Sequence, residues 1–181
     1  MFEVLKKIAK AFNQASIKWC LGGSLVLYYF DQIEEVHDID IIVDEKDYEK
    51  ARSILISVGE ARPTPTSDIF LTTHFSKYLV NGVKIDLIAG FKIQSSSGIY
   101  SYILDDLAIS KTVNLQGVII PLARLEDWYV LYHLMSKRED KIAIVEKYLS
   151  INQYNEALFI RALQQALPEE TIIAIHKLLK K

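Results

Sequence analysis

Apolar residues recur at helical spacing at the start of the chain and again along its last third. Phe2, Leu5, Ile8, Ala9 and Phe12 lie three or four residues apart, which predicts an amphipathic helix over residues 2–15. From Leu125 onward the helical spacing returns and continues to the end of the sequence. We therefore predict four further helices, over residues 125–136, 141–150, 155–166 and 168–181.

Between these regions the pattern favours β-strands joined by tight turns. Asn81-Gly82 is a preferred two-residue hairpin turn, and alternating residues flank it over 76–88. Gln116-Gly117 predicts a second hairpin within 112–123, and apolar runs predict strands at 17–21, 38–43 and 69–75. Helices are expected from Ser24 to Phe30 and over 45–59, where Gly59 ends the second one. Prolines predict a loop over 61–68, and the serine-rich stretch predicts a flexible loop over 94–100.

These elements together predict an α/β (α+β) fold. We expect a mixed β-sheet flanked by helices in a domain spanning residues 1–120, followed by a helical C-terminal extension over 121–181. No internal repeat and no low-complexity linker interrupts the chain.

Composition narrows the class of protein only modestly. The 181 residues are 50% hydrophobic and 24% charged, which is typical of a soluble globular chain. The net charge of −2 does not favour general binding to nucleic acid or anionic membranes, although a local basic patch for nucleic acid stays open. Cys20 is the only cysteine, so we expect no internal disulfide, no cysteine-based metal site and a cytoplasmic location. The N-terminal segment resembles neither a signal peptide nor a membrane span.

Carboxylates interrupt two of the predicted strands. Asp38 and Asp40 are two residues apart, so in a strand they share one face at a separation of roughly 7 Å. Asp86 has the same position in the strand after the Asn81-Gly82 turn. If the two strands are neighbours, three carboxylates converge, and such a group suits a pair of Mg²⁺ ions.

Gly22, Gly23 and Ser24 follow the strand predicted at 17–21. A glycine pair allows the backbone to approach a phosphate closely, and the next helix offers free N–H groups to an anion. Ser24 is expected to cap this helix and to add a hydroxyl hydrogen bond. The segment is therefore a candidate binding site for a triphosphate.

The order of these motifs resembles the minimal nucleotidyltransferases of the DNA polymerase β superfamily. The matching pattern is a strand, Gly23-Ser24, the Asp38-Ile39-Asp40 triplet and a third acid at Asp86 on a later strand. The resemblance covers residues 17 to about 90. It extends loosely to Lys137-Arg138-Glu139-Asp140, where Glu139 replaces the family's usual lysine and Ala143 its further acid.

This resemblance implies transfer of a nucleoside monophosphate from a nucleoside triphosphate to an acceptor hydroxyl, with release of pyrophosphate. It implies that Asp38 and Asp40 bind two metal ions, Mg²⁺ or alternatively Mn²⁺. It also implies that Asp86 binds the catalytic metal and helps to deprotonate the acceptor. The acceptor stays open among a small molecule, a protein and tRNA, and so does the choice of nucleotide.

Other residues near these motifs have both a functional and a structural interpretation. His37, Lys84, Lys137, Arg138 and Lys141 are candidates for phosphate contact, or are solvated ends of strands and helices. Tyr28 or Tyr29 stacks on a base or packs at the rim of its helix, and packing is also expected for Trp128, Tyr129 and Tyr132. Acceptor recognition is expected in the tail and in the loops at 60–68 and 92–100.

Three other functions remain alternatives at this point. The chain can be a toxin-like or antitoxin-like nucleotidyltransferase, or a catalytically silent nucleotide-binding or protein-interaction module on the same fold. The presence of all three acids argues against the silent module. A metal-dependent phosphohydrolase is disfavoured because further histidines and acids are missing around the motif. A homodimer or a complex with a small partner protein is compatible with the apolar tail.

Overall fold

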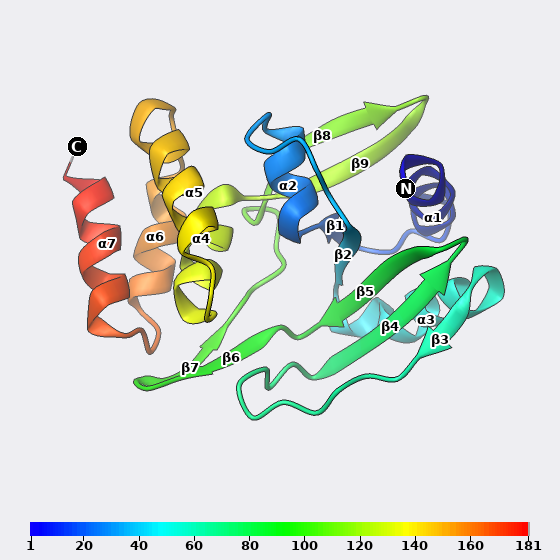
Figure 1. Ribbon diagram of the computed structural model, residues 1–181, viewed down its shortest axis with the longest axis horizontal. Helices are drawn as coiled ribbons and strands as arrows, with labels where there is room; N and C mark the ends of the chain where they lie inside the picture. The colour runs from blue at the N-terminus through cyan, green and yellow to red at the C-terminus, as the bar shows by residue number, and fades with distance from the viewer. Residues whose placement is uncertain (181) are drawn as a thin grey trace.

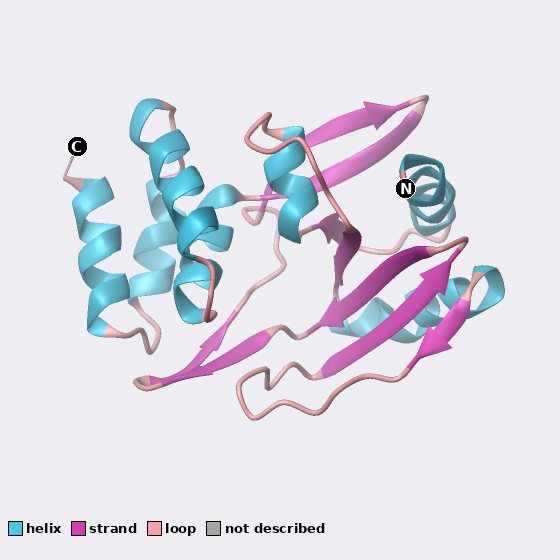
Figure 2. Cartoon of the chain, in the orientation of Figure 1, coloured by secondary structure: helices cyan, strands magenta, loops and turns pink. Residues whose placement is uncertain are grey.

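The protein is described here by a computed structural model covering residues 1–180. A mixed seven-stranded sheet lies between helices, and the C-terminal helices gather beside it (Figure 1; Figure 2). This arrangement is the expected α+β fold. The α-helices are α1 (Phe2–Gln14), α2 (Gly23–Tyr29), α3 (Tyr48–Val58), α4 (Leu125–Leu134), α5 (Glu139–Ile151), α6 (Glu156–Leu163) and α7 (Glu169–Leu179), and a 3₁₀ turn, η1 (Glu45–Asp47), precedes α3.

The seven strands of the main sheet occur in the order β3-β4-β5-β2-β1-β9-β8. Neighbouring strands run antiparallel except for the β2–β5 and β1–β9 pairs, which are parallel. A separate two-stranded sheet pairs β6 with β7. The strands are β1 (Trp19–Leu21), β2 (Asp38–Val43), β3 (Glu60–Arg62), β4 (His74–Val80), β5 (Val83–Ala89), β6 (Lys92–Ser95), β7 (Gly98–Ser101), β8 (Ile109–Leu115) and β9 (Val118–Ala123).

The two faces of the main sheet carry two hydrophobic clusters. Alternate residues of β2, Ile39 and Ile41 among them, pack with α1 and α3 on one face. Ile42 of β2 and Ile88 of β5 belong to the other cluster, which also contains the buried side of α4 and residues of α5, α6 and α7. Helix α4 is buried on almost all sides, because it packs against the sheet and also against the other C-terminal helices. It therefore connects these helices to the sheet. The division at residue 120 stays a prediction.

Both hairpins form at the predicted turns. Asn81 and Gly82 have positive φ angles of 49° and 78°, and Gln116 and Gly117 have φ angles of 51° and 86°. Positive φ at both central residues is the signature of the turn that matches the twist of the flanking strands.

Three predictions of local structure are wrong. The strand predicted at 69–75 begins only at His74, where β4 starts. Residues 69–73 instead lie against the edge of the small β6–β7 sheet, where Phe70 forms an isolated β-bridge with Ile93. The stretch 94–100 is not a flexible loop, since it contains most of the β6–β7 hairpin. Ser24 does not cap α2, because the helix begins one residue earlier, at Gly23, and Gly22 is the N-cap residue.

Candidate active site

Asp38, Asp40 and Asp86 lie on one face of two neighbouring strands. Strands β2 and β5 are paired in parallel, and Asp40 is directly opposite Asp86 in the register. Ile39 precedes Asp40 and Ile85 precedes Asp86, and both isoleucines are fully buried on the opposite face. The structure thus confirms that the three carboxylates converge, and all three line the same cleft. Their chemical roles stay predictions.

The glycine turn lies against the acidic strand. The backbone N–H of Gly22 donates to the carbonyl oxygen of Asp40 at 2.8 Å, which fixes the turn beside β2. Gly23 has a φ of 60°, and a Cβ atom there would be 1.7 Å from Oδ2 of Asp40. At Gly22 a Cβ would be 2.5 Å from Cζ2 of Trp128. Gly23 therefore has to be glycine because of Asp40 on the sheet, and Gly22 because of Trp128 on α4.

Ser24 contacts a cation instead of capping its helix. Nζ of Lys141, on α5, donates to Oγ of Ser24 at 2.6 Å and lies 5.5 Å from the ring centre of Tyr132. Burial lowers the pKa of Lys141, as does the neighbouring Arg138, while Asp40 and Asp38 act in the opposite direction. A serine hydroxyl and an ammonium group thus meet at the start of α2, close to the carboxylates.

The third carboxylate has a partner that the sequence analysis missed. Lys77 on β4 is directly opposite Asp86, and its ammonium forms an ion pair with Oδ2 of Asp86. A two-residue turn at Asn81-Gly82 fixes the hairpin register, so the pairing of Lys77 with Asp86 follows from counting outward from the turn. Lys84, one of the candidates named from the sequence, is exposed and does not line the cleft.

Asp40 is under electrostatic strain. Burial, followed by the charges of Asp38 and Asp86, raises the pKa of Asp40 to about 7, although Lys141 and Lys77 oppose the shift. Within residues 1–180 the side chains of Asp38 and Asp40 make no hydrogen bond or ion pair, whereas Asp86 is held by Lys77. The site therefore has negative charge in excess of its direct partners.

This excess of carboxylate oxygen fits a hard divalent cation such as Mg²⁺. Asp38 and Asp40 are available to hold it, and Asp86 joins them if its carboxylate gives up Lys77. Over the residues that the structure describes, no three Asp, Glu, His or Cys side chains are grouped closely enough to form a complete ligand set. The structure thus supplies carboxylate oxygens from Asp38, Asp40 and Asp86, and Lys77 is paired with the last of these carboxylates.

The cleft around these residues has a volume of about 610 Å³, which is within the range of small-molecule sites. The loop at 60–68 contributes to it as expected, whereas residues 92–100 do not line it. Besides Gly23, Pro65, Ile88 and Met135, its lining falls into four groups: the three carboxylates; the cations Lys77, Arg138 and Lys141; the hydroxyl residues Ser24, Thr64, Thr66, Ser67 and Thr72; and the aromatic residues Phe70, Phe75, Phe91, Trp128 and Tyr132.

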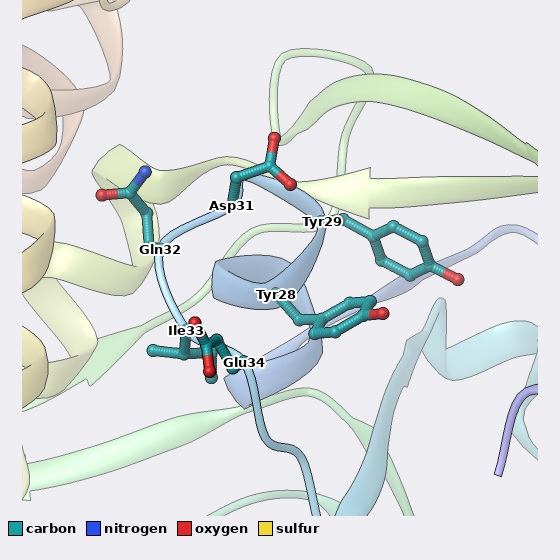
Figure 3. Close-up of a pocket in the computed structure, with 6 residues that line it drawn as sticks. All are labelled: Tyr28, Tyr29, Asp31, Gln32, Ile33 and Glu34. Carbon is teal, nitrogen blue, oxygen red and sulfur yellow. The ribbon is translucent and has the colours of Figure 1, made fainter.

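Tyr28, Tyr29 and His37 lie outside this cleft. Both tyrosines line a separate hollow beside the loop that joins α2 to β2, together with Asp31 and Glu34 (Figure 3). His37 lines a neighbouring hollow with Phe2 and Tyr28. Stacking of either tyrosine on a base bound at the carboxylates is therefore not supported by their position.

A parallel pair of acidic strands next to a Gly-Gly-Ser turn is the arrangement of a nucleotidyltransferase, and the comparisons agree. Residues 4–139 match the family model of aminoglycoside-2''-adenylyltransferases, so the chain belongs to this family. No curated protein matches the sequence.

Solved structures of nucleotidyltransferases share the fold. A protein of Thermotoga maritima assigned to this class is 25% identical, with a TM-score of 0.62 over 83% of this chain and 92% of that one. ANT(2'')-Ia in complex with adenylyl-2''-tobramycin has a TM-score of 0.58 at 8% identity, over 99% of this chain and 97% of its own. The lincosamide antibiotic adenylyltransferase LnuA, with lincomycin bound, has a TM-score of 0.54 at 15% identity, over 78% and 94% of the two chains.

The family and the Thermotoga maritima relative establish that the chain is an enzyme, a nucleotidyltransferase. No helix within residues 1–180 has the length and apolar character needed to cross a membrane.

Proposed function

We propose that this protein transfers a nucleoside monophosphate from a magnesium-bound nucleoside triphosphate to a hydroxyl group of a small molecule. The observation that carries the proposal is the convergence of Asp38, Asp40 and Asp86 beside Gly23, with Asp38 and Asp40 lacking a direct partner. Adenylyl-2''-tobramycin in the structure of ANT(2'')-Ia and lincomycin in that of LnuA support the choice of a small molecule over a protein or tRNA.

In the proposed reaction, the acceptor oxygen attacks the α-phosphorus and a new P–O bond forms. The bond between the α-phosphorus and the bridging oxygen breaks, and pyrophosphate leaves with that electron pair. Asp86 accepts the hydroxyl proton directly or through water, and release of its carboxylate from Lys77 would make it a stronger base. Bound Mg²⁺, held by Asp38 and Asp40 and joined by Asp86, would supply charge neutralisation for the phosphates and the leaving group.

The triphosphate is assigned to the Gly22–Ser24 turn and to Lys141. Helix α2 has only seven residues, so the dipole of α2 is a minor contribution. Ser24 and Lys141 provide a hydroxyl and an ammonium group at 2.6 Å from each other, and an ammonium donor to phosphate forms a strong, charge-assisted hydrogen bond. Arg138 lines the same cleft and adds positive charge for the leaving pyrophosphate.

Calorimetric titration with ATP, GTP, CTP and UTP, each with Mg²⁺, tests this proposal. We expect metal-dependent binding of at least one nucleotide by the wild type and none by the Asp38→Asn/Asp40→Asn double variant. The matched control is Glu34→Gln/Glu35→Gln, which removes two carboxylates of the adjoining loop that line the neighbouring hollows and not the cleft. Failure of the folded wild type to bind any nucleotide in the presence of metal would contradict the proposal.

A further inference from the structure

Part of the lining of the cleft is apolar and aromatic. Phe70, from the loop between β3 and β4, and Phe91, after β5, stack with ring centres 6.3 Å apart. Phe75 at the start of β4 lines the same region, together with Ile88 and Met135. Phe70 is 43% exposed and Phe91 only 5%, so the accessible part of this pair is mainly the ring of Phe70. It would bury the apolar body of a ligand.

The apolar rim at Ile69–Leu71 is held in place by backbone hydrogen bonds. The N–H of Leu71 donates to the carbonyl of Lys92 at 3.0 Å, and the N–H of Gln94 donates to the carbonyl of Ile69 at 2.7 Å. These bonds fasten the β3–β4 loop to the edge of β6, as its course in Figure 1 shows. Three consecutive apolar side chains nevertheless stay 48%, 43% and 39% exposed. A fixed, exposed apolar surface beside a cleft is typical of a ligand-binding site.

Once Asp38, Asp40 and Asp86 hold a metal ion, the cleft has no other carboxylate within residues 1–180 to pair with a polycation. Apart from Asp38, Asp40 and Asp86, none of the described residues that line it is a carboxylate. The other ionised side chains are Lys77, Arg138 and Lys141, and all three are positive. With these three carboxylates occupied by metal, an acceptor with several ammonium groups would lose hydration on entering without gaining carboxylate partners, and would be repelled by the cations.

We propose that the acceptor is a hydroxyl-bearing small molecule with an apolar or aromatic body, and that it is not a polycationic amino sugar. This inference rests on the proposed function and assigns the Phe70–Phe75–Phe91 region as the acceptor subsite. Thr64, Thr66 and Ser67, which lie on the same β3–β4 loop as Phe70 and also line the cleft, supply hydroxyls for the polar groups of the acceptor. The substrate class therefore differs from the tobramycin seen with ANT(2'')-Ia, although the family is shared.

The test uses the aromatic anion 8-anilinonaphthalene-1-sulfonate as a probe, with the wild type saturated by Mg²⁺ and a non-hydrolysable ATP analogue. We expect saturable binding of one probe molecule and about tenfold weaker binding by Phe70→Ala, the order expected for loss of one aromatic contact surface. The control Ile173→Ala removes an apolar side chain that is 60% exposed on α7, and its affinity for the probe should match that of the wild type. Tobramycin should neither displace the probe nor cause pyrophosphate release from any of the four nucleotides.

The following results would overturn the assignment of the acceptor subsite. Tobramycin-dependent pyrophosphate release that Asp86→Asn abolishes would show that the acceptor is a polycation. Probe binding that is absent, or equal in the wild type and Phe70→Ala, would remove the apolar subsite. Weaker binding of the nucleotide analogue by Phe70→Ala would show that the aromatic region holds the base. Nucleotide binding that survives in Asp38→Asn/Asp40→Asn would instead contradict the proposed function, whatever the probe does.

Discussion

Gly23 and Asp40 occupy adjoining space that no side chain larger than hydrogen can share. A Cβ atom at Gly23 would be 1.7 Å from Oδ2 of Asp40, and the φ of Gly23 is 60°. The glycine turn and the acidic strand therefore form one unit, in which the identity of Gly23 determines where the Asp40 carboxylate lies.

Gly23→Ala is expected to abolish binding of the magnesium nucleotide. The left-handed backbone alone costs roughly 1–2 kcal/mol for an alanine, and the clash with Asp40 adds to this cost. Gly82→Ala is the matched control, because Gly82 has a φ of 78° but nothing within 4 Å of its added Cβ. We predict similar backbone strain in both variants and loss of binding only in Gly23→Ala, measured by urea unfolding and calorimetry. Unchanged nucleotide affinity in folded Gly23→Ala would refute the coupling.

Lys141→Met is expected to weaken nucleotide binding by roughly 10- to 100-fold, the range for loss of one hydrogen bond to a charged group. Its ammonium lies 2.6 Å from Ser24 Oγ in the cleft. Lys84→Met is the control, because Lys84 is on β5, close to Asp86, but is exposed and outside the cleft. Calorimetry should show a change only in the first variant. Equal losses in both would mean that only the overall charge matters.

Lys77→Met is expected to increase the stabilisation of the protein by Mg²⁺. In the wild type Lys77 is paired with Oδ2 of Asp86 and therefore competes with a cation for this carboxylate. Without Lys77 the repulsion among the carboxylates is larger in the metal-free protein and is relieved by metal. Thermal unfolding with and without Mg²⁺ should show a lower metal-free Tm and a larger metal-induced rise in the variant. An equal rise in both proteins would mean that Lys77 does not compete with the metal.

The pKa of Asp40 predicts a pH-dependent stability in the metal-free protein. In the folded protein this pKa is raised to about 7, whereas an unfolded aspartate titrates near about 3.9. Between these values the unfolded chain releases a proton that the folded chain retains, so the contribution of Asp40 to stability falls as pH rises from about 4 to about 7. Asp40→Asn cannot titrate, so its stability relative to the wild type should increase from pH 5 to pH 8.

Urea unfolding of the wild type and Asp40→Asn at pH 5 and pH 8, in the presence of a metal chelator, measures this difference in stability. Asp127 is buried and has a pKa raised to about 7 by that burial, against the effect of Arg161. The wild type and Asp40→Asn share Asp127, so its contribution cancels in the comparison. Parallel pH profiles for the two proteins would contradict the raised pKa of Asp40.

The main elements of the site could be predicted because they depend on local rules. The alternation in β2 placed Asp38 and Asp40 on one face, and the Asn81-Gly82 turn defined the strand that carries Asp86. Their convergence also required that β2 and β5 be neighbours, which the strand order provides. The Lys77–Asp86 pair was predictable from the same turn but was missed, because Lys84 is closer in the sequence.

Other features depend on contacts between segments that are distant in the sequence. Lys141 and Ser24 are far apart in the chain, and they meet because α4 packs on the sheet and thereby positions α5. Residues 69–71 have the apolar character of a strand, but their backbone pairs with the edge of β6 and does not extend β4. No local pattern specifies such a partner, because the energy comes from tertiary packing and backbone pairing.

Anomalous diffraction from crystals soaked with Mn²⁺ and a non-hydrolysable ATP analogue would show whether Asp38, Asp40 and Asp86 together bind the metal of a nucleotide. We expect anomalous density among the three carboxylates, with the triphosphate at Gly23, Ser24 and Lys141 and with Lys77 moved away from Asp86. Bound nucleotide with no metal at these carboxylates, or with the metal held elsewhere, would show that the proposed metal site is wrong.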